Sequence, residues 1–123
     1  MKINSLPLIM ALLLTSCSQP IEIKPNKLPD AYLNDPYQAE IEIIGGSVVE
    51  MSFSAKVSDT NFRILHHIDT DGYPDYNHLT VQGTPIVLKP IYIKLVGGTY
   101  GTNFPGKEFV KEYKIMVKEQ YNK

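Results

Sequence analysis

The fold is decided by residues 37–57, YQAEIEIIGGSVVEMSFSAKV, in which two stretches of alternating apolar and polar side chains flank a pair of glycines. Successive side chains of a strand point to opposite faces of a sheet, so this alternation predicts strands that are buried on one face only. We expect one strand over residues 37–43 and another over residues 49–57. Because Gly45 and Gly46 can adopt the positive φ values of a tight turn, the pair predicts a hairpin between the two strands.

Further short strands are expected on both sides of this region, and helical periodicity is almost absent. The additional predicted strands cover residues 21–24, 62–68, 79–81, 86–96 with a break at Pro90, and 109–118. Proline has no N–H to donate, which favours a sheet edge or a bulge at that position. About seven strands with turn residues between them predict an all-β fold, with a β-sandwich favoured and a closed barrel as the alternative.

Length and composition restrict the class of protein. The chain has 123 residues, 43% of them apolar and 20% charged, with a net charge of −1. This is enough for one domain and gives no basic excess for nucleic-acid binding. No phosphate-binding loop or dinucleotide fingerprint is present, so we expect no cofactor. Cys17 is the only cysteine, which excludes a disulfide within the chain.

The first 16 residues have the order of a secretory signal peptide. Lys2 supplies a positive charge, residues 3–14 are mostly apolar, and two small residues precede Cys17. The apolar run is about a dozen residues long, whereas a membrane-spanning helix needs roughly 20. We therefore expect residues 1–16 to be removed.

Residues 14–17, Leu-Thr-Ser-Cys, resemble the lipobox of bacterial lipoproteins. The resemblance implies that the Cys17 sulfur receives a diacylglycerol group and that its amine is acylated after cleavage. Two or three acyl chains give stable membrane anchoring. Ser18 stands where inner-membrane lipoproteins of enteric bacteria often carry Asp, which by analogy favours the outer membrane. The alternative is an ordinary signal peptide followed by an unmodified thiol.

The mature chain divides into a polar tether over residues 17–27 and a domain over residues 28–120. Residues 28–45, with Leu-Pro-Asp at their start, resemble the opening of bacterial immunoglobulin-like and cadherin-like domains. Residues 79–85, LTVQGTP, resemble a later motif of the same domains. The resemblance implies an immunoglobulin-like β-sandwich.

An acidic segment supplies the first candidate site. Asp69, Asp71, Asp75 and Asn77 provide oxygen ligands of the kind that calcium prefers. The spacing is not that of an EF-hand, because glycine comes at the fourth position of the segment. Asp, Gly, Pro and Asn are also common turn residues, so a calcium site and a solvated turn are both open.

Three histidines suggest a metal site less strongly. His66 and His67 are adjacent, so they should point to opposite faces of a strand and should not share an ion. His66 has the parity of Phe62 and Ile64, which predicts a core position, and His67 then faces outward. His78 lies beyond the acidic segment.

Aromatic residues in two loops are candidate binding residues. Tyr100 and Phe104 lie in a glycine-rich loop, and Tyr73 and Tyr76 lie in the acidic segment. Exposed aromatic side chains on loops are effective binding anchors. The alternative is that they fold back and close the end of the sandwich.

Three functions are considered in order. The first is a non-catalytic, membrane-anchored interaction module of the bacterial cell envelope that binds another envelope protein or a glycan. The second is a structural or assembly component that pairs through a sheet edge. The third is a hydrolase that uses the Asp69–Asp75 region with His78, and it is not expected because no nucleophile motif accompanies these residues.

Overall fold

The computed structural model describes residues 20–101 and 106–120. The predicted signal peptide, the lipobox with Cys17, and Phe104 lie outside the described residues.

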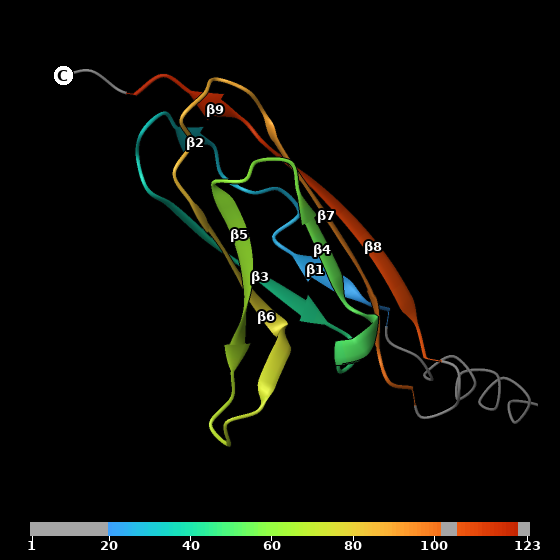
Figure 1. Cartoon of the computed structure of the whole chain (residues 1–123). Coiled ribbons are helices and arrows are strands. Elements are labelled where there is room, and N and C mark those ends of the chain that lie inside the picture. The colour runs from blue at the N-terminus through green and yellow to red at the C-terminus, as the bar shows by residue number, and fades with distance from the viewer. Residues whose placement is uncertain (1–19, 102–105, 121–123) are drawn as a thin grey trace, which may run out of the picture.

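Two antiparallel sheets pack against each other in an elongated molecule (Figure 1). One sheet has four strands in the spatial order β1-β3-β6-β5, and the other has three in the order β4-β7-β8. The strands are β1 (Glu22–Lys24), β2 (Ala31–Tyr32), β3 (Tyr37–Ile44), β4 (Ser54–Val57), β5 (Phe62–Ile68), β6 (Pro74–Gly83), β7 (Ile91–Gly98), β8 (Glu108–Ile115) and β9 (Val117–Lys118). The short strands β2 and β9 form a parallel pair at the upper end in Figure 1.

The order of the strands is that of an immunoglobulin constant-type sandwich. Counting the seven strands of the two sheets along the chain, the first, second, fifth and fourth form one sheet, and the third, sixth and seventh form the other. This is the arrangement of immunoglobulin strands ABED and CFG. The predicted all-β, immunoglobulin-like sandwich is confirmed.

The core lies between the sheets and follows the alternation that the sequence shows. In β3, Tyr37, Ala39, Ile41 and Ile43 are buried, and the residues between them are exposed. The side chains of β7 alternate in the same way and meet those of β3 and β8 in one apolar cluster. Each strand therefore contributes one apolar face to the core and one polar face to solvent.

The predicted hairpin at Gly45 and Gly46 is wrong. β3 pairs with β1 and β6, whereas β4 pairs with β7, so the glycines carry the chain from one sheet to the other. Gly45 has a φ of +111°, and the backbone of Pro20 lies so close to it that a Cβ would clash with the Pro20 carbonyl oxygen. Both the backbone conformation and the close approach of Pro20 require glycine here.

Several strand limits also differ from the prediction. Residues 50–52 form a 3₁₀ turn, so the strand expected over residues 49–57 is confined to β4. The strand expected over residues 79–81 is the ten-residue β6, because polar residues 74–78 continue the pairing. β7 begins only after Pro90, and the pair of β2 with β9 was not predicted.

The sandwich begins earlier in the chain than residue 28. β1 lies within the predicted tether and pairs with residues 42–44 of β3. The part of the chain between Cys17 and the folded body is therefore shorter than the sequence suggested. No helix among the described residues is both long and apolar enough to cross a membrane.

Truncation of a core side chain tests the packing. Ile41 is 1% exposed, and we expect Ile41→Ala to lower the free energy of unfolding by about 2–5 kcal/mol, because it removes buried contacts and leaves a cavity. The same truncation at the exposed Ile86 should cost far less. Chemical denaturation of both variants measures the difference, and equal losses would contradict the assigned core.

Candidate functional site

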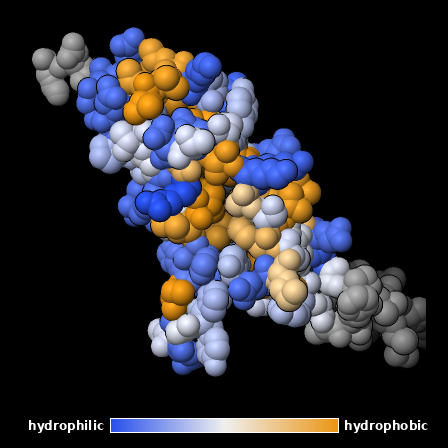
Figure 2. Space-filling view, viewed as in Figure 1, coloured by the Kyte–Doolittle hydropathy of each residue, from blue (hydrophilic) through white to orange (hydrophobic). Residues whose placement is uncertain are grey.

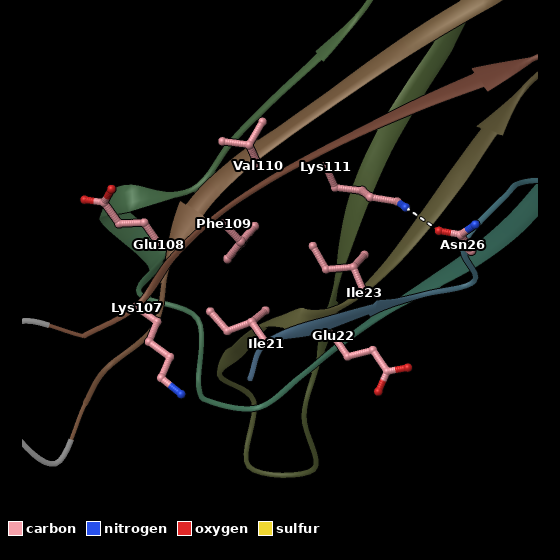
Figure 3. Close-up of a pocket in the computed structure, with 9 residues that line it drawn as sticks. All are labelled: Ile21, Glu22, Ile23, Asn26, Lys107, Glu108, Phe109, Val110 and Lys111. Carbon is pink, nitrogen blue, oxygen red and sulfur yellow. Dashed lines mark hydrogen bonds between the residues drawn. The ribbon is translucent and has the colours of Figure 1, made fainter. Parts of the chain in front are cut away.

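An open groove lies between the two sheets, along one edge strand of each. β1 is an edge strand of the four-stranded sheet, and β8 is an edge strand of the three-stranded sheet. The groove has a volume of about 750 Å³ and is lined by residues of both strands and of the segment after β1 (Figure 3). It is therefore bounded on two sides by strands that lack a partner on the groove side within residues 20–101 and 106–120.

The groove combines an apolar interior with a polar rim. Ile21, Ile23 and Phe109 extend into the space between the strands in Figure 3, and Phe109 is buried. Glu22 and Glu108 point away from it. At one end, the Lys111 ammonium donates a hydrogen bond to Asn26 Oδ1 at 3.1 Å and closes the groove.

A buried tyrosine fixes the chain beyond that end of the groove. The Tyr113 hydroxyl donates to the Pro25 carbonyl oxygen at 2.6 Å. Burial raises the pKa of Tyr113 to about 12, so the phenol stays protonated and remains a donor at neutral pH. This contact ties the segment after β1 to β8 and holds the two sides of the groove together.

Every second residue of β8 points its backbone N–H and C=O groups to the groove side. The Thr99 N–H donates to the Lys107 carbonyl oxygen at 2.8 Å, which makes Thr99 and Lys107 a hydrogen-bonded pair of the β7–β8 hairpin. In an antiparallel ladder such pairs alternate with pairs whose N–H and C=O groups point outward. The outward-pointing backbone groups are therefore those of Glu108, Val110 and Glu112.

The acidic segment forms the tip of the β5–β6 hairpin. Asp69 Oδ1 accepts hydrogen bonds from the backbone N–H groups of Asp71 and Tyr73, both at 2.9 Å. Gly72 has a φ of +90°, as a tight turn requires. The Asp69 carboxylate thus satisfies backbone donors of the turn.

Asn77, the fourth proposed calcium ligand, has a structural role. Its Nδ2 donates to the carbonyl oxygens of Ile43 at 2.9 Å and Gly46 at 2.7 Å, and its Oδ1 accepts from the Val48 N–H at 3.0 Å. All three bonds brace the segment that crosses between the sheets. Among the described residues, no group of three or more His, Cys, Asp or Glu side chains could hold a metal ion, so the calcium prediction gains no support.

The predicted core position of His66 is wrong. His66 is exposed, and its ring stacks on Tyr76 with a centroid distance of 4.4 Å. Tyr76 also contacts Phe53 at 5.2 Å, so this candidate binding residue is engaged in packing. His66 keeps the parity of Phe62 and Ile64, because the register of β5 and β6 shifts only after it, but it lies beyond the buried part of β5 and is therefore exposed.

His67 points outward, as predicted, and lies beside His78 on the outer face of the four-stranded sheet, with ring centroids 6.0 Å apart. His67 Nε2 lies 2.9 Å from Thr80 Oγ1 and 3.2 Å from Glu40 Oε1. His78 Nε2 lies 3.5 Å from Glu42 Oε2. In the sequence, only the alternation of Glu40 and Glu42 with apolar residues indicated that polar side chains would lie on this face. The sequence does not show which residues of the neighbouring strands lie beside them.

His78 and Asp75 form the tightest ion pair of this face, with His78 Nδ1 2.7 Å from Asp75 Oδ2. The hydrogen bond that His78 donates to the Asp75 carboxylate raises the pKa of His78. Partial burial acts to raise the pKa of Asp75, but hydrogen bonds from His78 and Asn77 outweigh it and lower that pKa. No hydroxyl group among the described residues is hydrogen-bonded to His78, so the pair lacks a nucleophile to activate.

Two of the four candidate aromatic residues are freely exposed. Tyr73 and Tyr100 are each 67% exposed, at the hairpin tip and after β7 respectively. The Tyr100 N–H donates to the Ser47 carbonyl oxygen at 2.9 Å, which ties its loop to the crossing segment. Exposed aromatic side chains therefore remain available for binding on two loops, whereas Tyr76 is packed.

Fold and groove together place the chain among all-β sandwiches of immunoglobulin type with an accessible sheet edge. Among solved structures, the crystal structure of a point mutant of the SrpA adhesin from Streptococcus sanguinis is similar, with a TM-score of 0.57 and 14% sequence identity. The match covers 87% of this chain but only 63% of the adhesin chain. At this identity the similarity establishes the fold alone. No protein-family model and no curated protein matches the sequence.

The ion pair of Asp75 and His78 predicts a pH dependence of stability. The pKa of His78 is raised above its ordinary value of 6.5, so its contribution is full below that pH and is lost as the pH rises through the raised value. The pKa of Asp75 is lowered from 3.8, so its contribution is full above that pH and is lost as the pH falls. The pair should stabilise the fold most between these two values.

Asp75→Asn should therefore reduce the free energy of unfolding more at about pH 5 than at about pH 9. Denaturant titrations at both pH values measure the difference. Asp71→Asn is the matched control, because no hydrogen bond involves the Asp71 carboxylate within the described residues. Equal losses at the two pH values would show that the pair does not titrate as described.

Proposed function

We propose that this chain is a lipid-anchored binding module of the bacterial cell envelope, which holds an extended segment of a partner protein in the groove between β1 and β8. One observation carries the proposal: two strand edges, unpaired within residues 20–101 and 106–120, flank a groove with an apolar interior. A peptide strand that pairs with β8 would satisfy the outward backbone groups and cover the apolar side chains at the same time.

The geometry defines the segment that fits. Lys107 and the first four residues of β8 line the groove, so a strand of about five residues, or about 17 Å, would occupy it. Its side chains alternate between the groove interior and solvent. The inward positions should be apolar, to meet Ile21, Ile23 and Phe109, and the outward positions should be polar.

The location in the envelope rests on the first 17 residues. The signal-peptide order and the lipobox support export and acylation of Cys17, and Ser18 supports the outer membrane. The similarity to a bacterial adhesin fits a module that binds at a cell surface.

A second candidate function is binding through the loops, to a glycan or an envelope protein. The exposure of Tyr100 and Tyr73 supports it. In the sequence, Phe104 follows Tyr100 by four residues. This candidate differs from the first in depending on side chains of the loops, whereas strand pairing depends on the backbone of β8.

Replacement of the anchor cysteine tests the location. We expect Cys17→Ser to move the protein from the membrane fraction to the soluble fraction of its host, because a serine cannot receive the thioether-linked lipid. Mass spectrometry of the wild-type protein should find a mature chain that begins at acylated Cys17. Retention of Cys17→Ser in the membrane, or a free thiol in the wild type, would refute the anchor.

A proline in β8 tests the groove. Val110 has an outward N–H, so Val110→Pro removes a donor from the free edge without removing a hydrogen bond to β7. We expect it to abolish cross-linking of the partner in the host envelope, whereas Val110→Ala, which keeps the N–H, retains it. Thermal unfolding of both variants checks that the fold is intact.

Loop variants separate the two candidates. Tyr100→Ala and Phe104→Ala should leave strand pairing unchanged and weaken loop binding. Amide hydrogen exchange gives an independent measure: a bound strand should slow exchange at Glu108, Val110 and Glu112. If both loop variants lose the partner and Val110→Pro keeps it, the loops are the binding surface and the groove is not.

A further inference from the structure

Four segments converge at the end of the sandwich where the chain enters from residue 20. The Pro20 backbone packs on Gly45, and the following segment forms a β-bridge between Val48 and Thr99. The 3₁₀ turn over residues 50–52 is tied to the end of β7, since the Val49 N–H donates to the Gly98 carbonyl oxygen at 2.9 Å. The β5–β6 hairpin projects at this same end, as Figures 1 and 2 show.

Exposed apolar and amphipathic side chains lie on three of these segments. Met51 of the 3₁₀ turn is 95% exposed, and Tyr100 after β7 is 67% exposed. The β5–β6 hairpin adds Ile68, 60% exposed, and Tyr73, 67% exposed. None of these four side chains is needed for the core.

The distance to the proposed anchor is short. Only three peptide units separate Cys17 from Pro20, and a fully extended chain of that length spans at most about 11 Å. Pro20 is itself held against Gly45. An acylated Cys17 would therefore keep Pro20, where the chain enters this end of the sandwich, within about 11 Å of the anchor point at the membrane surface.

We infer that this end of the domain rests on the lipid surface, with Met51, Ile68, Tyr73 and Tyr100 in contact with the boundary between headgroups and acyl chains. The inference rests on the anchor of the proposed function and goes beyond it, because it assigns an orientation and a lipid-binding surface. Tyrosine suits this boundary, since its ring is apolar and its hydroxyl stays hydrated.

Exposure alone does not identify the lipid-facing end. Ile86, Val87 and Leu88 are also exposed and lie near β2, because the Asn34 N–H donates to the Pro85 carbonyl oxygen at 2.7 Å. In Figure 1, however, β2 lies at the opposite end of the molecule from the tip of the β5–β6 hairpin. The charges near the hairpin tip are acidic, with Asp69 and Asp71 both exposed, which favours zwitterionic over anionic lipid.

The composition of the chain permits a direct experiment. It has no tryptophan and a single cysteine, so one tryptophan can serve as a reporter and a maleimide lipid can be coupled to Cys17 of the mature chain. Tyr73→Trp and Tyr100→Trp report on the proposed surface, and Tyr32→Trp, in β2 at the other end, is the matched control. Each coupled protein is bound to phosphatidylcholine vesicles with brominated acyl chains, which quench a nearby tryptophan.

We expect the brominated lipid to quench Tyr73→Trp and Tyr100→Trp roughly twofold or more, and Tyr32→Trp hardly at all. The orientation would be overturned if the control were quenched to the same extent, or if none of the three tryptophan variants were quenched. The exposed side chains of this end would then be expected to contact a protein partner. Because the lipid is coupled chemically, this outcome does not depend on native acylation. The mass of the native N-terminus decides the anchor separately.

Discussion

The side-chain amide of Asn77 makes three hydrogen bonds to the backbone where the chain passes from one sheet to the other. An unpaired amide or carbonyl buried near a sandwich end costs about 1–3 kcal/mol, so one asparagine that satisfies three such groups defines the path of the segment. The same segment carries the contact of Gly45 with Pro20 and the bridge from Val48 to Thr99. The entry of the chain, the 3₁₀ turn and the loop after β7 therefore share one rigid end.

The two proposed surfaces follow from this arrangement and from the unequal lengths of the outer strands. β1 has three residues and β8 has eight, so much of the groove-side edge of β8 has no counterpart across the groove. A long free edge promotes pairing with another chain unless it is protected. In an anchored protein this edge would begin near the membrane and extend away from it, where an extended segment of another envelope protein could reach it.

The outer face of the four-stranded sheet shows how pairing register decides surface chemistry. Glu40 and Glu42 were expected to be exposed, and they are, but their neighbours His67 and His78 come from two other strands. His66, just before the register shift of β5 and β6, stacks on Tyr76, and His67, just after it, lies beside Glu40. The result is a network of polar contacts on this face, in which the pair of Asp75 and His78 contributes stability that changes with pH.

The sequence by itself determined the class of fold and most strand positions, because burial on one face imposes an alternation that is visible locally, as in β3 and β8. It also pointed to the exposed Tyr73 and Tyr100, although it could not separate them from the packed Tyr76. Tertiary structure alone decided which strands pair. Gly45 and Gly46 suit a hairpin and a crossing between sheets equally well, and only the partners of β3 and β4 distinguish the two. The hydrogen bonds of Asn77 and the stacking of His66 could not be foreseen for the same reason: their partners are backbone groups and a ring ten or more residues away, and such contacts leave no local pattern in the chain.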